Sequence, residues 1–427
     1  MICIAMLTGA LIGPVFAPDQ GETPMLRLIW LPVYAIIFGL ILARFEQVVR
    51  AWPAWLALAG LVALVYASKY WSIDPAVTGR RVIAMTMTGS FALYLGTAFT
   101  GDRLPRLLMQ TMLVLAVGSL VMVFAFPTIG VHQQDNAGLW RGLWYEKNQM
   151  GIVMVAGATA AAACLAAETG RWKAPALTLV LTTALVVATQ SKTSLLCLLL
   201  GLGLVAALWT MRRGGPVFTV VCVWLGIVVA GIGMYVFLTE PESILVALGK
   251  DPSLTGRTHI WDSLMRKVAD RPWTGYGYGA FWGRIGESVP ADWVRKETGW
   301  LVPSAHNGWI DLLVQLGWPG AVAVAGLFVT ATVVTLIRLG SAGLREGYWA
   351  IAYLAVFLLL SLSESVLLSH ASLPWTLFLA ILARALSPQA LAMSTSLAPN
   401  PQAAYQTRSR IAAQYAHGPA RRPLLRL

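Results

Sequence analysis

The amino-acid sequence predicts an all-α protein that crosses a membrane many times, and three observations carry this prediction. Hydrophobic residues make up 57% of the 427 residues, and the mean hydropathy is +0.68. Only 12% of the residues are charged, whereas a soluble domain carries about 25%. Apolar runs of roughly 18 or more residues recur along the chain, and the alternating pattern of outer-membrane strands is absent.

Hydropathy predicts about twelve transmembrane helices, several of them short. The expected spans are Met1–Phe16, Leu26–Ala43, Ala54–Ala67, Val82–Phe99, Leu107–Phe126, Gly151–Ala167, Ala174–Thr189, Ser194–Thr210, Val217–Leu238, Trp318–Ile337, Tyr348–Leu368 and Leu373–Leu386. All four cysteines lie inside apolar runs, and no CxxC spacing occurs. They are predicted to be small buried hydrophobes, so neither a disulfide framework nor a zinc site is indicated.

Lysine and arginine predict the orientation of these helices. With a cytoplasmic N-terminus, basic residues recur at every inner loop, from Arg44 near the start to Arg345 near the end, as the positive-inside rule requires. Both termini then lie in the cytoplasm and the interval Glu240–His306 lies outside it. The predicted organisation is N-terminal transmembrane helices (1–238), a large periplasmic loop (239–306), C-terminal transmembrane helices (307–388) and a basic cytoplasmic tail (389–427).

The polar interval Glu240–Gly320 holds the densest mixture of basic and aromatic residues in the chain. Basic residues kept on the outer side, such as Arg141, Lys192 and Arg257, are candidates for binding an anionic substrate. The alternative is that they cap helix ends, snorkel or pair with lipid phosphates. No Walker or dinucleotide motif occurs, and the glycines of Gly275–Gly279 are predicted to form a tight turn. A group transfer here therefore needs a donor that was activated elsewhere, and no cofactor is predicted.

The strongest local group of candidate residues is Ser304-Ala-His306-Asn307, followed by Asp311. His306 precedes a helix that re-enters the membrane, and a histidine there can take a proton from an attacking hydroxyl. The alternative is an interfacial histidine bonded to a backbone carbonyl. Glu364 lies near the outer end of an apolar span, where a carboxylate is costly unless it meets a cation. The histidines show no metal-ligand spacing, so a metal site is not predicted.

Seven short motifs follow one another from about Trp71 to Ser365. They are Trp71–Pro75 with Arg80 and Arg81, Arg141–Asn148, Gln190–Ser194, Thr255–Trp261, Arg271–Trp282, Ser304–Gly308 with Gly317 and Gly320, and Ser363–Ser365. This ordered series resembles the signature of the bacterial O-antigen ligase and polymerase superfamily. The sequence Gly-Tyr-Gly-Tyr-Gly-Ala-Phe-Trp looks most like its exopolysaccharide polymerase branch.

The resemblance implies a multi-pass glycosyltransferase of the GT-C type in the bacterial inner membrane, working without metal at the periplasmic face. Its donor would be a glycan on undecaprenyl pyrophosphate and its acceptor another glycan. Carried over by motif, His306 is implied to be the general base and Arg257 a pyrophosphate ligand. Arg141 and Lys192 are implied to be further donor ligands. Many relatives carry arginine at the position of Lys192, and lysine keeps the charge but lacks the bidentate fork.

Four further residues complete the candidate substrate site: Asn307, Glu364, Tyr276 and Trp282. The two aromatic side chains could stack on sugar rings, although an interfacial aromatic belt explains such residues equally well. The expected reaction is a single displacement that inverts the anomeric carbon, with charge on the leaving pyrophosphate stabilised by arginine.

Three functions remain open from the sequence. A polymerase is favoured over a ligase that moves finished polymer onto lipid A core or another acceptor, although both would share the donor chemistry and nothing in the sequence identifies the acceptor. A transporter is the remote alternative, since about twelve helices also suit a carrier, but no half-to-half repeat is evident. The implied partners are the lipid bilayer, a flippase and a chain-length regulator. Nucleic-acid binding is not indicated, because the basic residues serve topology.

Overall fold

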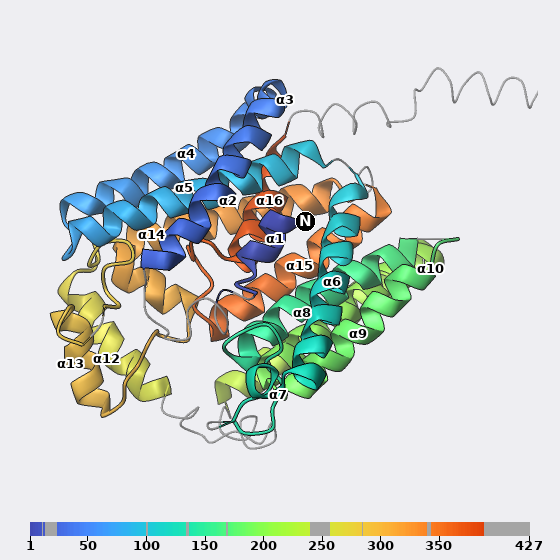
Figure 1. The fold of residues 1–427 in the computed structure, drawn as a ribbon. Helices are drawn as coiled ribbons and strands as arrows, with labels where there is room; N and C mark the ends of the chain where they lie inside the picture. Colours follow the sequence, from blue (N-terminus) through green and yellow to red (C-terminus); the bar gives the residue numbers. More distant parts are fainter. Residues whose placement is uncertain are drawn as a thin grey trace, which may run out of the picture.

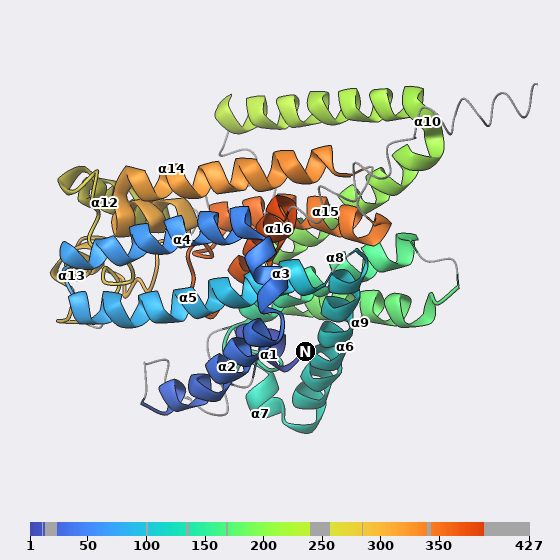
Figure 2. The ribbon, with the colours of Figure 1, turned by 90° about the horizontal axis from the view of Figure 1, so that it is seen from above.

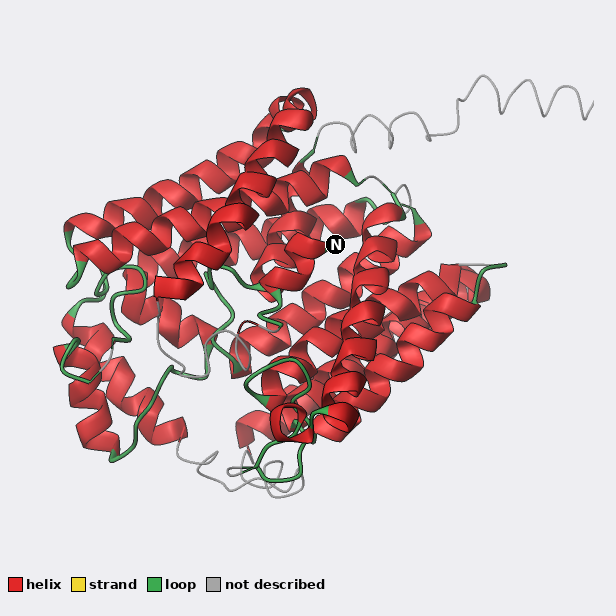
Figure 3. Cartoon of the chain, viewed as in Figure 1, coloured by secondary structure: helices red, strands yellow, loops and turns green. Residues whose placement is uncertain are grey.

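The computed structural model describes residues 1–10, 12, 24–99, 101–133, 136–167, 170–239, 257–283, 285–339 and 343–387. Across these ranges the regular structure is helical, with one isolated bridge between Val131 and Trp140 (Figure 3). The helices are α1 (Ile2–Leu7), α2 (Pro24–Ala43), α3 (Phe45–Arg50), α4 (Trp52–Ala67), η2 (Ser68–Tyr70), α5 (Pro75–Ala98), α6 (Arg103–Ala125), α7 (Pro127–Gly130), α8 (Lys147–Ala167), α9 (Lys173–Thr189), α10 (Lys192–Thr239), α12 (Arg257–Asp270), α13 (Val289–Thr298), α14 (Gly308–Ile337), α15 (Leu344–Ser363) and α16 (Leu373–Leu386). The predicted tail, 389–427, lies outside the described residues.

Six helices in the described part of the chain are long and apolar enough to cross a membrane. They are Trp52–Tyr70, Arg103–Ala125, Lys147–Ala167, Lys192–Gly226, Gly308–Ile337 and Leu344–Ser363. Shorter apolar helices cover Leu28–Ala43, Lys173–Thr189 and Leu373–Leu386. The prediction of an all-α, multi-pass membrane protein is therefore confirmed.

Helix α8 forms the centre of the bundle. Of its most apolar stretch, 78% is buried inside the protein, and it contacts α6, α9, α10 and α15. Glycines allow these close contacts: a Cβ on Gly157 would lie 2.7 Å from Met112 of α6, and Gly151 faces Ser194 of α10. Without a hydrophobic effect to drive helices together in lipid, such small residues let backbones approach and gain van der Waals contact.

Helix α10 joins two predicted spans through a bend. Gly215 has φ 77° and ψ −178°, and Pro216 follows it. Proline cannot donate a backbone N–H, so the helix breaks there. Figure 2 shows α10 turning back on itself at this bend, at the end of the bundle away from α12 and α13.

Helix α14 begins earlier than predicted, at Gly308, and is interrupted at Gly317, where φ is 64° and ψ is −164°. In an unbroken helix the Val314 carbonyl would accept the N–H of Trp318. Here Trp318 N–H donates to Pro272 O and Val314 O accepts from Tyr276 N–H, both at 2.8 Å. The loop thus satisfies the backbone groups that the break releases, as buried polar groups require.

The loop makes this contact through a tight turn, as the sequence predicted. Gly275, Gly277 and Gly279 have φ values of 62°, 96° and 70°, a region that glycine adopts without steric cost. A Cβ on Gly275 would lie 2.5 Å from the backbone carbon of Gln315. Only a glycine therefore lets the turn approach α14 so closely.

Residues preceding α5 fasten the other side of the turn. Trp71 Nε1 donates to Thr274 O at 2.7 Å, and Ile73 N–H donates to Tyr276 O at 3.1 Å. Arg81, from the first turns of α5, donates to Gly279 O at 2.6 Å. In this part of the molecule α12 and α13 lie beside the ends of α4, α5 and α14 (Figure 1). We call it the loop end.

We predict that Gly317→Ala detaches the loop from α14. The backbone at Gly317 lies in a region that is essentially restricted to glycine and costs another residue about 1–3 kcal/mol. The substitution should lower the thermal unfolding midpoint in detergent and expose the loop to trypsin. Gly326→Ala is the matched control, because Gly326 lies farther along α14 and a Cβ there meets nothing within 4 Å. Equal behaviour of the two variants would show that the break does not hold the loop.

Candidate functional site

His306 lies directly before α14, in a left-handed conformation with φ 47°. Its Nδ1 is 3.7 Å from Oε2 of Glu364, and the two side chains are 25% and 14% exposed. This distance exceeds that of a hydrogen bond, and Nδ1 is buried without a hydrogen-bond partner in the described structure. Glu364 directly follows the last residue of α15, and its carboxylate faces the imidazole of His306.

Ala305, the residue before His306, is held through both its backbone N–H and its backbone carbonyl. The Ala305 N–H donates to Oδ1 of Asp311 at 3.3 Å, and the Ala305 carbonyl accepts Trp261 Nε1 at 2.8 Å. The same Asp311 oxygen accepts Trp282 Nε1 at 2.6 Å. Asp311 is only 4% exposed, so its carboxylate joins α14, the aromatic end of the turn and the segment that carries His306.

Asn307 begins α14 as its N-cap. Its side-chain oxygen accepts the N–H groups of Trp309 and Ile310, at 3.0 and 3.2 Å. This arrangement satisfies two of the backbone donors that every helix leaves open at its start. The side chain of Asn307 therefore fixes where the helix begins, directly after His306.

Arg257 reaches the same place from another element. It is the first residue of α12, and its Nη1 donates to the carbonyl of Ser363 at 3.0 Å. Ser363 ends α15 and precedes Glu364, where a guanidinium also complements the negative end of the helix dipole. His306, Glu364 and Arg257 thus converge on the end of α15, and we call these three residues the α15-end cluster.

The structure places the other two predicted basic ligands on separate elements. Arg141, in the loop between α7 and α8, donates to the carbonyls of Ile129, Tyr145 and Thr128, at 2.8, 3.4 and 3.4 Å. Its guanidinium is therefore engaged with α7 and with its own loop, and no hydrogen bond joins it to the α15-end cluster among the described residues. Lys192 is the first residue of α10 and is exposed.

The position of Lys192 relative to the cluster follows from helix packing. Gly201 of α10 lies against Val356 of α15, and Cys197, nearer the start of α10, interacts electrostatically with Glu364, directly after α15. The two helices run in opposite directions, so α10 begins at the end where α15 finishes. Lys192 and the α15-end cluster therefore lie at the same end of the bundle.

The two predicted aromatic ligands differ in their surroundings. Trp282 is half-buried, packs edge-on against Phe281 at 4.9 Å between ring centroids, and bonds to Asp311. Tyr276 is only 6% exposed and lies under the guanidinium of Arg271, 4.9 Å from its ring centroid. Burial raises the pKa of Tyr276 to about 12, which keeps the phenol neutral at physiological pH. Trp282 alone of the pair is linked to the segment carrying His306.

The sequence did not predict the roles of Asp311 and Trp261, although both lie in or beside the motifs. For Asp311 the sequence contains a signal: an aspartate in an otherwise apolar helix predicts a buried carboxylate, which needs partners. Among the described residues, no group of three or more His, Cys, Asp or Glu could hold a metal ion. The site that the structure assembles is thus one of arginine, histidine and carboxylate groups beside indole rings.

Two comparisons with known proteins indicate the class to which this helical membrane protein, with its large loop and its order of motifs, is similar. A family model described as O-antigen ligase matches residues 177–325, which include Arg257 and His306. The comparison with curated proteins finds similarity to the exopolysaccharide production protein ExoQ of Rhizobium meliloti (strain 1021). The two are 26% identical over 321 residues, which cover 72% of each chain. The resemblance to the O-antigen ligase and polymerase superfamily, on its exopolysaccharide branch, is confirmed.

We predict that Asp311→Ala disorders the segment carrying His306. The change leaves Trp282 Nε1 and the Ala305 N–H without their acceptor, at a cost of about 1–3 kcal/mol for a buried donor. Hydrogen exchange of residues 257–305 should rise while that of α8 stays unchanged. Asp262→Ala is the control, because Asp262 is an exposed carboxylate on α12. Unchanged exchange in Asp311→Ala would contradict the role assigned to this carboxylate.

Proposed function

We propose that the chain is a glycosyltransferase that polymerises exopolysaccharide or O-antigen repeats from an undecaprenyl-pyrophosphate-linked donor. The observation that carries the proposal is the α15-end cluster, where His306, Glu364 and Arg257 meet although they come from three separate segments. The comparisons support ligase- or polymerase-type chemistry, and the curated relative is named for exopolysaccharide production. The reaction would take place at the periplasmic face of the inner membrane, where positive-inside topology puts the loop.

In the proposed reaction, an acceptor sugar hydroxyl attacks the anomeric carbon of the donor. The new glycosidic C–O bond forms as the bond to pyrophosphate breaks, and the anomeric configuration inverts. Because Nδ1 of His306 faces Glu364, Nε2 is the nitrogen that would take the hydroxyl proton. The carboxylate would then stabilise the imidazolium as it forms, in the manner of other oriented histidine bases.

Arg257 would stabilise the charge that develops on the leaving pyrophosphate. A guanidinium can bind phosphate oxygens through two parallel N–H groups, and a donor held in place before reaction contributes most in the transition state. Among the described residues, Arg257 donates through Nη1 to the Ser363 carbonyl, and its other nitrogens have no protein acceptor there and could bind a ligand. Lys192 and Arg141 would bind the donor farther from the bond that breaks. In this proposal arginine stabilises the charge of the leaving group, as a metal ion does in other enzymes.

We also propose a GT-C-like arrangement with about twelve crossings of the membrane. The six long spans and the shorter apolar helices support it. Helix α5 supports it as well, because the helix is long. Arg80 and Arg81, which lie in its first turns at the loop end, lower its hydropathy. The large loop, 239–306, would complete the site between the two groups of transmembrane helices.

Arg257→Ala and His306→Ala should each abolish polymer formation, because each removes a group that acts in the transition state. Membrane levels of both variants should equal wild type. The matched controls lie on α12: Arg266→Ala removes an arginine whose side chain is 59% exposed, and His259→Ala removes an exposed histidine. Polymer is measured in a deletion strain complemented with each variant. Polymer persisting in both site variants would refute the assigned roles.

A ligase is the second candidate, because the matching family model is itself described as O-antigen ligase. Lipid-linked glycans extracted from a deletion strain distinguish the two functions. Loss of a polymerase should leave single repeats on the carrier lipid, which is the expected result. Long polymer still attached to the carrier would instead identify a ligase.

A further inference from the structure

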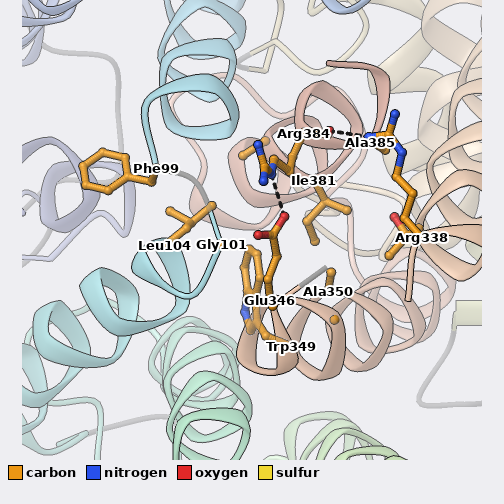
Figure 4. A pocket seen from close by; sticks show the side chains of 14 residues that line it. Phe99, Gly101, Leu104, Arg338, Glu346, Trp349, Ala350, Ile381, Arg384 and Ala385 are labelled. Atoms are coloured by element: carbon orange, nitrogen blue, oxygen red, sulfur yellow. Dashed lines mark hydrogen bonds and ion pairs between the residues drawn. The ribbon is translucent and has the colours of Figure 1, made fainter. Parts of the chain in front are cut away.

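A second polar site lies at the end of the bundle opposite the loop end. A cavity of about 70 Å³ opens there between the ends of α14 and α16, the start of α15 and the link from α5 to α6 (Figure 4). Its charged lining consists of Arg338, Arg384 and Glu346, and its apolar lining includes Phe99, Leu104 and Trp349. None of these residues belongs to the α15-end cluster, so the proposed glycosyl transfer does not explain them.

The charges in this cavity leave a surplus of positive charge. Arg384 Nε lies 2.6 Å from Oε1 of Glu346, and Arg338 Nη1 donates to the carbonyl of Arg384 at 3.0 Å. The pair with Glu346 uses only Nε, so both terminal nitrogens of Arg384 are without a partner among the described residues. Among the residues that line the cavity, there are thus two guanidinium groups and one carboxylate.

A buried indole adds an independent sign of a polar ligand. Trp349 is only 1% exposed, yet its Nε1 has no hydrogen-bond partner in the described structure. Buried donors are normally paired, and this indole lines the same cavity as the two arginines. The start of α15 itself is already occupied, because Asp102 accepts the N–H of Arg345 at 3.0 Å. A bound anion would therefore be held by side chains rather than by the helix end.

The depth of the cavity identifies the kind of anion. Arg338 directly follows α14, Glu346 lies in the first turn of α15, and Arg384 lies in the last turn of α16. Ends of membrane-spanning helices lie at the level of the lipid headgroups. Basic pockets between helices at that level suit acidic headgroups, and the apolar remainder of the lining suits acyl chains.

We propose that this cavity binds the phosphate of an anionic phospholipid, with Arg338 and Arg384 as its ligands. Guanidinium groups match phosphate geometry and give up their hydration more readily than an ammonium does. The bound lipid joins α14, α15 and α16 at the end of the bundle where a short link, 338–343, separates α14 from α15.

The test uses the full-length protein in nanodiscs of phosphatidylcholine, with or without phosphatidylglycerol. Phosphatidylglycerol should raise the unfolding temperature and remain bound in native mass spectrometry. Arg338→Gln should weaken its retention about tenfold or more, as expected for the loss of a hydrogen bond between charged groups. Glu346→Gln should strengthen retention, because it removes the carboxylate that competes with the phosphate.

Two further variants control for general effects. Arg50→Gln removes an exposed arginine from α3 that pairs with Glu46 on the same helix, and it should leave retention unchanged. Ala350→Leu keeps every charge and fills the cavity, so it should displace the lipid without removing an arginine. Equal retention of phosphatidylglycerol by wild type, Arg338→Gln and Ala350→Leu would overturn the proposal. Selective retention of added undecaprenyl phosphate in its place would overturn it as well.

Discussion

The break of α14 at Gly317 is the constraint on which the loop end depends. A membrane-spanning helix normally satisfies its own backbone groups, since lipid offers no alternative partner. Here the helix gives up that arrangement at one residue. The tight turn at Gly275–Gly279 donates to the released carbonyl of Val314, and Pro272, just before the turn, accepts the released N–H of Trp318. The turn in turn positions Trp282, which fixes the carboxylate of Asp311. The geometry of the site therefore begins with a backbone conformation that only glycine adopts readily.

The candidate site is assembled from segments that are distant in the sequence. The hydrogen bond from Arg257 to Ser363 joins residues 106 positions apart, and Asp311 and Trp261 hold the Ala305 peptide from opposite sides. The first contact holds the Arg257 guanidinium itself, and the other two restrain the segment that carries His306. A histidine held by its neighbours in this way loses little freedom when substrate binds, which favours preorganised catalysis.

The two ends of the bundle place their charged side chains in different surroundings. At the loop end, arginine and histidine side chains lie beside backbone carbonyls and the carboxylate of Glu364, next to a long polar loop. At the opposite end, Arg338, Arg384 and Glu346 enclose a small cavity at the level of the helix ends. Between the two ends, α8 packs through small residues and carries no charged group beyond its first turn. The apolar centre thus separates two polar sites with separate chemical requirements.

The sequence by itself determined the class of the protein, because composition and long apolar runs require helices in lipid. It also determined the tight turn and the motifs that carry Arg257 and His306, since glycine spacing and motif order are local properties. Only the tertiary structure decided that the carboxylate of Glu364 faces His306 and that the guanidinium of Arg141 is engaged with α7. The opposite-end cavity was likewise hidden, because Arg338 and Arg384 appear as separate residues in the sequence. The reason is physical: which side chains meet across helices depends on packing between distant segments, and no local pattern records that packing.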